Sequence, residues 1–102
     1  MKNSKIAIIG GGNLGVAITE GLIKSRFTSP SDITVTRRNV DSLKSLKVLG
    51  VNTTSDNQEA VQNSNIIIVA LKPYNVREVL EGLKEYFQPK QHVVISVVTG
   101  VF

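Results

Sequence analysis

The sequence predicts an α/β fold in which a parallel sheet carries helices on both faces. Short apolar runs, clearest at residues 6–9 and 66–71, alternate with segments of helical period along the 102-residue chain. Such alternation is typical of β-α-β units, whose right-handed crossovers make the strands parallel. Because a glycine-rich turn follows the first strand, we expect the doubly wound strand order 3-2-1-4-5. The expected strands are residues 5–9, 33–36, 51–54, 65–71 and 92–96.

Two helices are expected in the first half of the chain. The first covers residues 13–25, and the second starts after Asn39, whose side chain suits the N-cap position. Gly50 is expected at the C′ position that ends the second helix. Apolar and small residues at helical spacing predict the faces that pack on the sheet: Leu14, Ala17, Ile18, Gly21 and Leu22 in the first helix, and Leu43, Leu46 and Leu49 in the second.

Two further helices are predicted from capping-box spacings. Asp56 and Glu59 have the spacing that starts a short helix, which we expect to end near Gln62. Asn75 and Glu78 repeat the spacing before a longer fourth helix. The apolar face of that fourth helix is Val76, Val79, Leu80 and Leu83.

The composition is that of an ordinary globular domain, with 41% hydrophobic and 20% charged residues. The absence of cysteine excludes disulfides, thiolate catalysis and a cysteine-ligated zinc site. The formal net charge of +4 comes from lysines and arginines spread along the chain. Because dispersed charge favours solubility over recognition, we expect no nucleic-acid partner.

No segment resembles a membrane anchor or a secretory signal. The apolar run at residues 66–71 is far shorter than the roughly 20 residues that a membrane span requires. The polar segment at residues 1–5 lacks the apolar region and cleavage site of a signal peptide. We therefore expect a cytoplasmic protein with no membrane partner.

The glycine-rich turn at residues 10–15 is the strongest functional signal. Gly10, Gly12 and Gly15 follow an apolar strand at once and open an amphipathic helix, which is the context that a dinucleotide-binding turn requires. A purely structural turn is the alternative. A phosphate loop of the ATP-binding type would end in Gly-Lys-Ser/Thr, whereas Gly15 is followed by Val16.

Each glycine has its own expected task. Gly10 makes the sharp turn, Gly12 lets the backbone approach a pyrophosphate, and Gly15 lets the helix lie close to the strand. The free N–H groups near Asn13 and Leu14, together with the helix dipole, would attract the phosphates. The turn therefore predicts a Rossmann-type dinucleotide-binding domain.

The end of the second strand indicates which dinucleotide is bound. Domains that hold the free ribose diol of NAD usually place an acidic residue there, but this strand ends in Thr36, Arg37 and Arg38. Asp32 lies at the wrong end of the strand. Since a guanidinium binds phosphate bidentately, we interpret these three residues as a 2′-phosphate pocket and expect NADP(H) more than NAD(H). The alternative is that Arg37 and Arg38 are a pair of solvent-exposed residues at the end of the strand with no role in binding.

Several motifs together carry a family resemblance. They are residues 5–15, Glu20-Gly21-Leu22, Thr36-Arg37-Arg38-Asn39, Asp56-Asn57, Ala70-Leu71-Lys72-Pro73 and residues 96–100. Their combination resembles the amino-terminal domain of pyrroline-5-carboxylate reductase. Singly they are shared with the wider 6-phosphogluconate dehydrogenase-like superfamily, including coenzyme F420-dependent NADP oxidoreductases. The resemblance implies NAD(P)H-dependent reduction of the cyclic imine pyrroline-5-carboxylate to proline, the last step of proline synthesis.

The resemblance also implies roles for individual residues. Asn57 would contact the adenosine ribose, and Ala70, Lys72 and Pro73 would line the cofactor trough after the fourth strand. Residues 96–100 would approach the nicotinamide, although the family usually has small residues where this chain has Val98 and Thr99. Helix capping by Asn57 and a helix start at Pro73 are the structural alternatives.

No catalytic residue is assigned. His92 is the only histidine and is expected at the strand end opposite the crevice, and Tyr74 has no partner residue that would make it an acid. The resemblance implies that reductases of this family continue into a helical carboxyl-terminal domain that forms the dimer and supplies much of the substrate site. Residues 1–102 would therefore be the cofactor domain, inactive alone.

Three functions remain open at this stage. The first is the cofactor domain of a proline-synthesising reductase, and the second is a self-contained NADP(H)-binding module that senses or regulates. The third is the cofactor domain of a protein like the coenzyme F420-dependent NADP oxidoreductases. The first is favoured by the apolar residues near the end of the sequence, because an exposed apolar edge marks a surface that contacts a partner. These residues are Val97, Val98, Val101 and Phe102. That partner would be a further domain, or a second copy in a homo-oligomer that forms through this edge.

Overall fold

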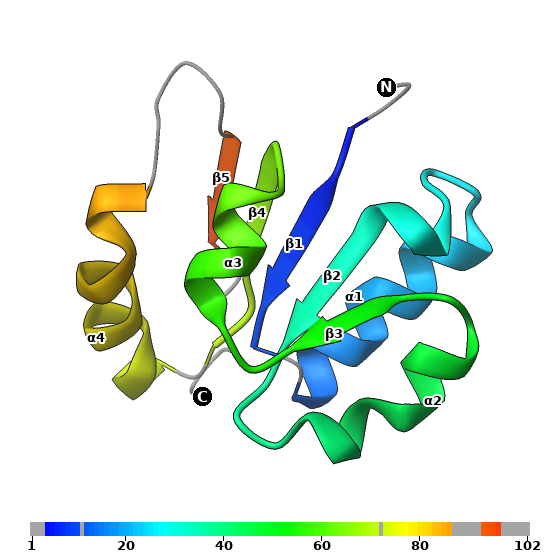
Figure 1. Ribbon diagram of the computed structural model, residues 1–102, viewed down its shortest axis with the longest axis horizontal. Coiled ribbons are helices and arrows are strands. Elements are labelled where there is room, and N and C mark those ends of the chain that lie inside the picture. Colours follow the sequence, from blue (N-terminus) through cyan, green and yellow to red (C-terminus); the bar gives the residue numbers. More distant parts are fainter. Residues whose placement is uncertain (1–3, 11, 72, 87–92, 97–102) are drawn as a thin grey trace.

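Five parallel strands form one sheet in the computed structural model, which describes residues 4–10, 12–71, 73–86 and 93–96 (Figure 1). In chain order the strands are β1 (Ile6–Ile9), β2 (Ile33–Thr36), β3 (Asn52–Thr54), β4 (Ile66–Val69) and β5 (Val93–Ser96). Their order across the sheet is β3-β2-β1-β4-β5, and every neighbouring pair is parallel. The predicted doubly wound order is confirmed.

Helices cover both faces of this sheet, as predicted (Figure 1). The second predicted helix differs from expectation, because it begins as a 3₁₀ turn in which the Asn39 side chain accepts a hydrogen bond from the Asp41 N–H. The helices are α1 (Asn13–Lys24), α2 (Lys44–Val48), α3 (Asn57–Gln62) and α4 (Pro73–Leu83), with 3₁₀ turns at Pro30–Asp32, Val40–Leu43 and Lys84–Tyr86.

The capping spacing predicted the start of α4 wrongly, whereas the structural alternative, a helix start at Pro73, is confirmed. The helix begins at Pro73, before the capping spacing of Asn75 and Glu78. Proline suits the first helical position, because its fixed φ is helical and its missing N–H would have no partner there. The predicted cap of α3 is confirmed, since the Asp56 carboxylate accepts from the N–H groups of Gln58 and Glu59.

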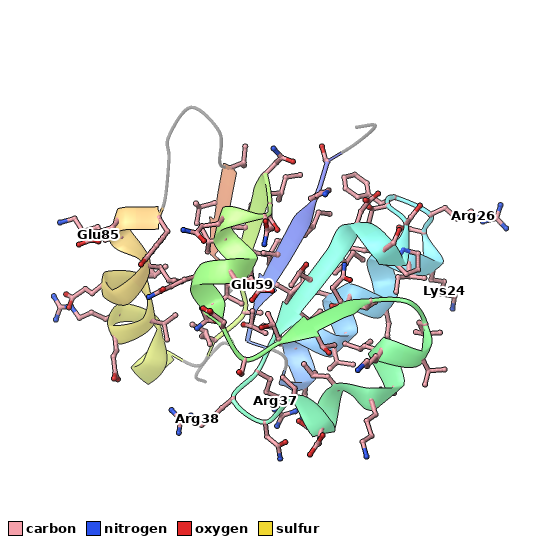
Figure 2. The ribbon with its side chains drawn as sticks, in the orientation of Figure 1. Lys24, Arg26, Arg37, Arg38, Glu59 and Glu85 are labelled. Atoms are coloured by element: carbon pink, nitrogen blue, oxygen red, sulfur yellow. The ribbon has the colours of Figure 1, made fainter. Side chains whose placement is uncertain are left out.

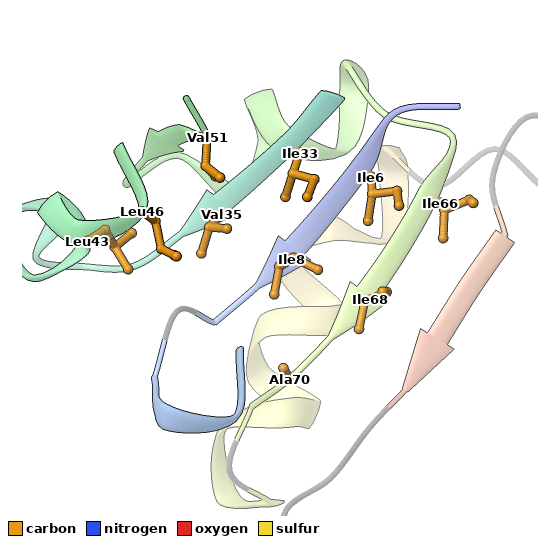
Figure 3. Close-up of a cluster of buried hydrophobic side chains, with 10 residues drawn as sticks. All are labelled: Ile6, Ile8, Ile33, Val35, Leu43, Leu46, Val51, Ile66, Ile68 and Ala70. Carbon is orange, nitrogen blue, oxygen red and sulfur yellow. The ribbon is translucent and has the colours of Figure 1, made fainter. Parts of the chain in front are cut away.

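One face of the sheet packs against α1 and α2. Side chains from β1, β2 and β4 project to this face in alternation along each strand (Figure 3). The 3₁₀ turn at Val40–Leu43 and α2 cover these side chains with Leu43 and Leu46. The buried cluster consists of Ile6, Ile8, Ile33, Val35, Leu43, Leu46, Val51, Ile66, Ile68 and Ala70.

The opposite face packs against α3 and α4. The residues of β1 and β4 that alternate with the first set contribute here, so both strands are buried on both sides. This explains why they are apolar without interruption. The second buried cluster consists of Ala7, Ile9, Ala60, Val61, Ile67, Val69 and Leu83.

The buried face of α1 differs from the predicted stripe. Gly15 and Thr19 are its buried residues, whereas Ala17 and Gly21 are exposed. The helix approaches the end of β1 most closely at Gly15, and this contact sets the rotation of α1 about its axis. At 3.6 residues per turn, Thr19 then also faces the sheet. The partly buried residues that pack beside them are Leu14, Val16, Ile18, Leu22 and Ile23. Leu49, predicted on the inner face of the second helix, is also exposed, because α2 ends at Val48.

Two residues adopt left-handed backbone conformations where helices end. Gly50 has φ +99° at the predicted C′ position. Arg26 has φ 60° in the corresponding place after α1, where its N–H donates to the Ile23 carbonyl and the Phe27 N–H donates to the Leu22 carbonyl. These two bonds form a Schellman motif, in which the position that Arg26 occupies usually holds glycine.

β5 forms one edge of the sheet. Within the described residues, Val93, Val94 and Ile95 of this edge strand are all exposed. The register pairs Val93 with Ile66 and Ile95 with Ile68, so the apolar surface continues that of β4 on the α1 face. None of the helices in the described ranges is long and apolar enough to cross a membrane.

Candidate functional site

The carboxyl ends of β1, β2 and β4 meet at one edge of the sheet. Ile9, the last residue of β1, pairs with Thr36 of β2 on one side and with Val69 of β4 on the other. The glycine turn that follows Ile9 therefore lies between the residues that follow the two neighbouring strands. Ligands of open α/β sheets bind at this edge, where the strand order reverses.

Gly10 makes the sharp turn that its position predicts. Its φ is +103°, a conformation that residues with a side chain rarely adopt. A Cβ on Gly10 would lie 2.7 Å from the Ala70 carbonyl oxygen and 2.7 Å from Leu71 Cδ2. Because a backbone oxygen cannot move aside, no other residue fits this position without displacing the strand end.

Gly15 allows the close packing of α1 on the turn, also as predicted. A Cβ on Gly15 would overlap the carbonyl oxygen of Gly10. The Gly15 carbonyl in turn accepts a buried hydrogen bond from the Thr19 hydroxyl at 2.7 Å. The start of the helix is thereby fixed against the end of β1.

Gly12 differs from the other two glycines, because the space beside it is empty. Apart from Gly12 itself and its two chain neighbours, no atom of the described residues lies within 4 Å of a Cβ built on Gly12. Gly12 is the N-cap of α1, and no side chain of the described residues caps the helix there. The first turn of α1 also contains no acidic residue.

The N–H groups that open α1 have no acceptor within the helix. The first helical hydrogen bond joins the Val16 N–H to the Gly12 carbonyl at 2.9 Å. The N–H groups of Asn13, Leu14 and Gly15 precede it and lie at the positive end of the helix dipole. This arrangement provides hydrogen-bond donors for an anion beside the empty space at Gly12.

Thr36 is placed differently from the surface position expected in a phosphate pocket. The residue is 1% exposed, and its Oγ1 accepts a hydrogen bond from the Gly10 N–H at 3.2 Å. Its hydroxyl is therefore engaged with the glycine turn. Sequence reasoning missed this contact, because it depends on the register between β1 and β2.

Arg37 and Arg38 are exposed at the same edge as the glycine turn, and Arg26 lies far from them (Figure 2). The Arg37 N–H donates to the Thr54 carbonyl at 3.2 Å, which fixes the backbone beyond β2 to the end of β3. Asp32 precedes β2 and so lies at the opposite end of that strand, as predicted. Both guanidinium groups thus come from the segment that would face an adenosine ribose.

The remaining predicted cofactor residues follow β3 and β4. Asn57 is half-buried and is the first residue of α3, but the cap is made by Asp56. Ala70 is buried, and its N–H donates to the Ile9 carbonyl at 2.9 Å. Pro73 opens α4 at the same edge, and Lys72 lies outside the described residues, as do His92 and residues 97–100.

A separate polar groove of about 240 Å³ lies over β2, β3 and α3. None of the predicted cofactor residues that the structure describes lines it. Its walls include the turn before β2 and the amino-terminal end of β1, away from the glycine turn. The lining residues are Lys5, Ser31, Asp32, Thr34, Asn52, Thr53, Thr54, Glu59 and Asn63. In the part of the chain that the structure covers, no group of three His, Cys, Asp or Glu side chains could hold a metal ion.

Known proteins with similar sequences and structures were found. The chain is 41% identical to pyrroline-5-carboxylate reductase 2 of Dictyostelium discoideum over 99% of its length. The solved structure of a pyrroline-5-carboxylate reductase from Coxiella burnetii matches 99% of the chain with a TM-score of 0.87 and 37% identity. That of Plasmodium falciparum pyrroline carboxylate reductase, with NADP bound, matches 96% with a TM-score of 0.81, and at 24% identity it supports the fold alone.

The chain is much shorter than these relatives. It spans 34% of the Dictyostelium protein, 37% of the Coxiella chain and 34% of the Plasmodium chain. The family described as NADP oxidoreductase, coenzyme F420-dependent, matches residues 5–100. The shared fold, the glycine turn and this match over nearly the whole chain show that the protein belongs to the coenzyme F420-dependent NADP oxidoreductase family.

Proposed function

We propose that this chain is the NADP(H)-binding domain of a pyrroline-5-carboxylate reductase-like enzyme. The observation that carries the proposal is the start of α1, where the N–H groups of Asn13, Leu14 and Gly15 precede the first helical hydrogen bond and a Cβ on Gly12 would meet no atom beyond its chain neighbours. The pyrophosphate of a dinucleotide is the anion that such a turn binds in this fold. Gly10 and Gly15 hold the turn in shape.

The adenosine half of the cofactor would lie across the ends of β2 and β3. Arg37 and Arg38 would bind the 2′-phosphate of NADP(H), and Asn57 would contact the ribose. The lack of an acidic residue at the end of β2 supports this choice over NAD(H). The Plasmodium reductase was solved with NADP bound. Ala70, Lys72 and Pro73 would line the trough toward the nicotinamide.

The reaction assigned to the whole enzyme is the reduction of a cyclic imine. When bound, NADPH would supply the hydride to the imine carbon of pyrroline-5-carboxylate, and a proton would reach the nitrogen, so that proline and NADP⁺ form. The chain's own residues would bind and orient the cofactor. We assign none of them as a catalytic acid.

A further part of the enzyme would hold the substrate. The relatives are nearly three times as long as the chain, and a helical carboxyl-terminal domain would form the second wall of the substrate site. The open apolar edge of β5, with Val93, Val94 and Ile95 exposed, supports contact with that domain or with a second copy of the chain. We place the enzyme in the cytoplasm.

A second candidate is supported by the family match over residues 5–100. In that case the hydride partner of NADP(H) would be coenzyme F420. The cofactor site of this chain would be the same under both proposals, and only the second wall would differ.

The experiment that tests the proposal has two steps. Isothermal titration of the 102-residue chain with NADPH and NADH should give a preference for NADPH of at least about tenfold, which is about 1.4 kcal/mol. The full protein, in which this domain's own proposed carboxyl-terminal domain supplies the second wall, should then oxidise NADPH with pyrroline-5-carboxylate. Turnover with coenzyme F420 alone would favour the second candidate, and binding of NADPH without either turnover would favour a regulatory module.

A further inference from the structure

The peptide group between Ile9 and Gly10 is held from two neighbouring strands. Its carbonyl, on Ile9, accepts a hydrogen bond from the Ala70 N–H at 2.9 Å. Its N–H, on Gly10, donates to Thr36 Oγ1 at 3.2 Å. The residues that follow β4 and end β2 thus hold the two ends of the peptide plane that leads into the glycine turn.

The two contacts differ in what the sequence requires. Any residue except proline at position 70 can donate the backbone N–H, but only a side chain with a suitably placed oxygen can accept from Gly10. Thr36 pairs with Ile9 across the sheet and is 1% exposed, so water has little access to replace its hydroxyl. A buried N–H that loses its acceptor destabilises the conformation that holds it.

The orientation of this peptide plane sets the geometry of the glycine turn. Gly10 adopts φ +103°, and its carbonyl oxygen lies against Gly15. A rotation of the plane would therefore move the Gly10 carbonyl relative to the first turn of α1, where the donors for an anion lie. Thr36 is well placed to prevent that rotation.

We propose that Thr36 is a positioning residue, which holds the glycine turn in its binding conformation without itself contacting the 2′-phosphate. The proposal rests on the proposed binding of a dinucleotide. It assigns Thr36 to the pyrophosphate half of the site, whereas Arg37 and Arg38, directly after it, serve the 2′-phosphate. Loss of the hydroxyl should therefore weaken NADP⁺ and NAD⁺ binding by the same factor.

The test uses Thr36→Val, which keeps the shape of the side chain and removes the acceptor, and Thr36→Ser, which retains the hydroxyl. Thr34→Val is the matched control, since Thr34 lies two residues away on the same face of β2. Each 102-residue variant is titrated with NADP⁺ and NAD⁺. Hydrogen exchange of the Gly10 amide, followed by NMR without cofactor, provides a readout that does not depend on binding.

We expect Thr36→Val to weaken both affinities about tenfold, to leave their ratio unchanged within about twofold and to speed Gly10 exchange about tenfold. Thr36→Ser should restore all three values, and Thr34→Val should change none. A selective loss of NADP⁺ affinity would show direct contact with the 2′-phosphate and overturn the proposal. So would an unchanged Gly10 exchange rate, or a serine variant that behaves like the valine.

The two proposals fail in different ways. If the unmodified chain binds neither dinucleotide, the proposed function is wrong, and the exchange rate of Gly10 still decides whether Thr36 holds the turn. If Thr36→Val does not fold, Thr36→Ala replaces it in the same comparison with Thr36→Ser. Unchanged affinities in a folded variant would overturn the positioning role alone.

Discussion

The carbonyl oxygen of Gly10 occupies the place where a side chain on Gly15 would begin. This contact, in which the end of β1 and the first turn of α1 touch through backbone atoms, requires glycine at position 15. Glycine at position 10 is required separately, by its φ of +103° and by the Ala70 carbonyl oxygen beside it. The contact fixes both the direction of the helix and the position of its N–H groups. Local stability and the geometry of the proposed site therefore depend on the same pair.

Gly15→Ala should damage folding as well as binding. The new methyl group must displace the Gly10 carbonyl, and overpacking of this kind costs about 1–3 kcal/mol. Thermal unfolding should show a lower Tm. Gly21→Ala is the control, because Gly21 is exposed on the same helix with open space around it and should gain about 0.5–1 kcal/mol. Equal stability of the two variants would refute the packing role of Gly15.

Gly12→Val should abolish binding and leave the fold intact. A side chain at position 12 would meet no atom beyond its chain neighbours, so the valine should cost only the poorer N-cap, about 0.5–1 kcal/mol of the free energy of unfolding. Its side chain would occupy the place proposed for the pyrophosphate. We expect at least a hundredfold loss of NADPH affinity, about 2.8 kcal/mol, by isothermal titration. Gly21→Val should bind NADPH normally, and undiminished affinity in a folded Gly12→Val chain would contradict the proposed site.

Replacing Arg37 and Arg38 together with alanine should remove the preference for NADPH. A charge-assisted hydrogen bond to phosphate contributes about 1.5–3 kcal/mol, so NADPH affinity should fall at least tenfold. NADH affinity should change by less than about twofold. Arg26→Ala removes an exposed arginine at the far side of the molecule and should affect neither (Figure 2). A parallel loss of both affinities at constant ionic strength would argue against a 2′-phosphate pocket.

Arg26→Gly should stabilise the protein. Arg26 has φ 60° in the Schellman motif after α1, where glycine adopts the conformation without a steric penalty. The gain should be about 0.5–1 kcal/mol after the greater flexibility of glycine in the unfolded chain is deducted. Urea unfolding measures it. Ser25→Gly, one residue earlier and at φ −77°, should give no gain.

Ile95→Lys tests the open edge of the sheet. If β5 contacts a second copy, a charge on the exposed Ile95 should lower self-association in concentration-dependent sedimentation. Val48→Lys places the same charge on exposed α2 and should have no effect. A chain that sediments as a monomer before any substitution would count against a homo-oligomer and leave the further domain as the partner.

Much of the fold could be predicted, because strong local patterns coincide with it. Residues 33–36 form β2 as expected, and the apolar runs of β1 and β4 are buried on both faces. The errors arose where packing overrides local pattern. Ala17 and Gly21 suggested an inward stripe, but the approach of Gly15 rotates α1 so that polar Thr19 is buried in their place.

The site was predictable at the glycines and less so around them. The spacing of the glycines between an apolar strand and an amphipathic helix identified the turn at Gly10 and the packing at Gly15, since few residue types permit either geometry. The contact between Thr36 and Gly10 joins residues 26 positions apart, and no sequence pattern around Thr36 predicts it. A long-range hydrogen bond of this kind becomes visible only when the register of the sheet is known.

The empty space at Gly12 has a consequence for how such a domain changes by mutation. A methyl group there meets no protein atom, so selection for a stable fold alone would not remove it. Apart from the modest preference for glycine over alanine at an N-cap, only selection for the cofactor would preserve glycine at this position. A domain that had lost its ligand could drift here and remain folded, whereas Gly10 and Gly15 would be retained in either case. Among related chains, the residue at position 12 would thus distinguish cofactor binders from folded descendants that no longer bind.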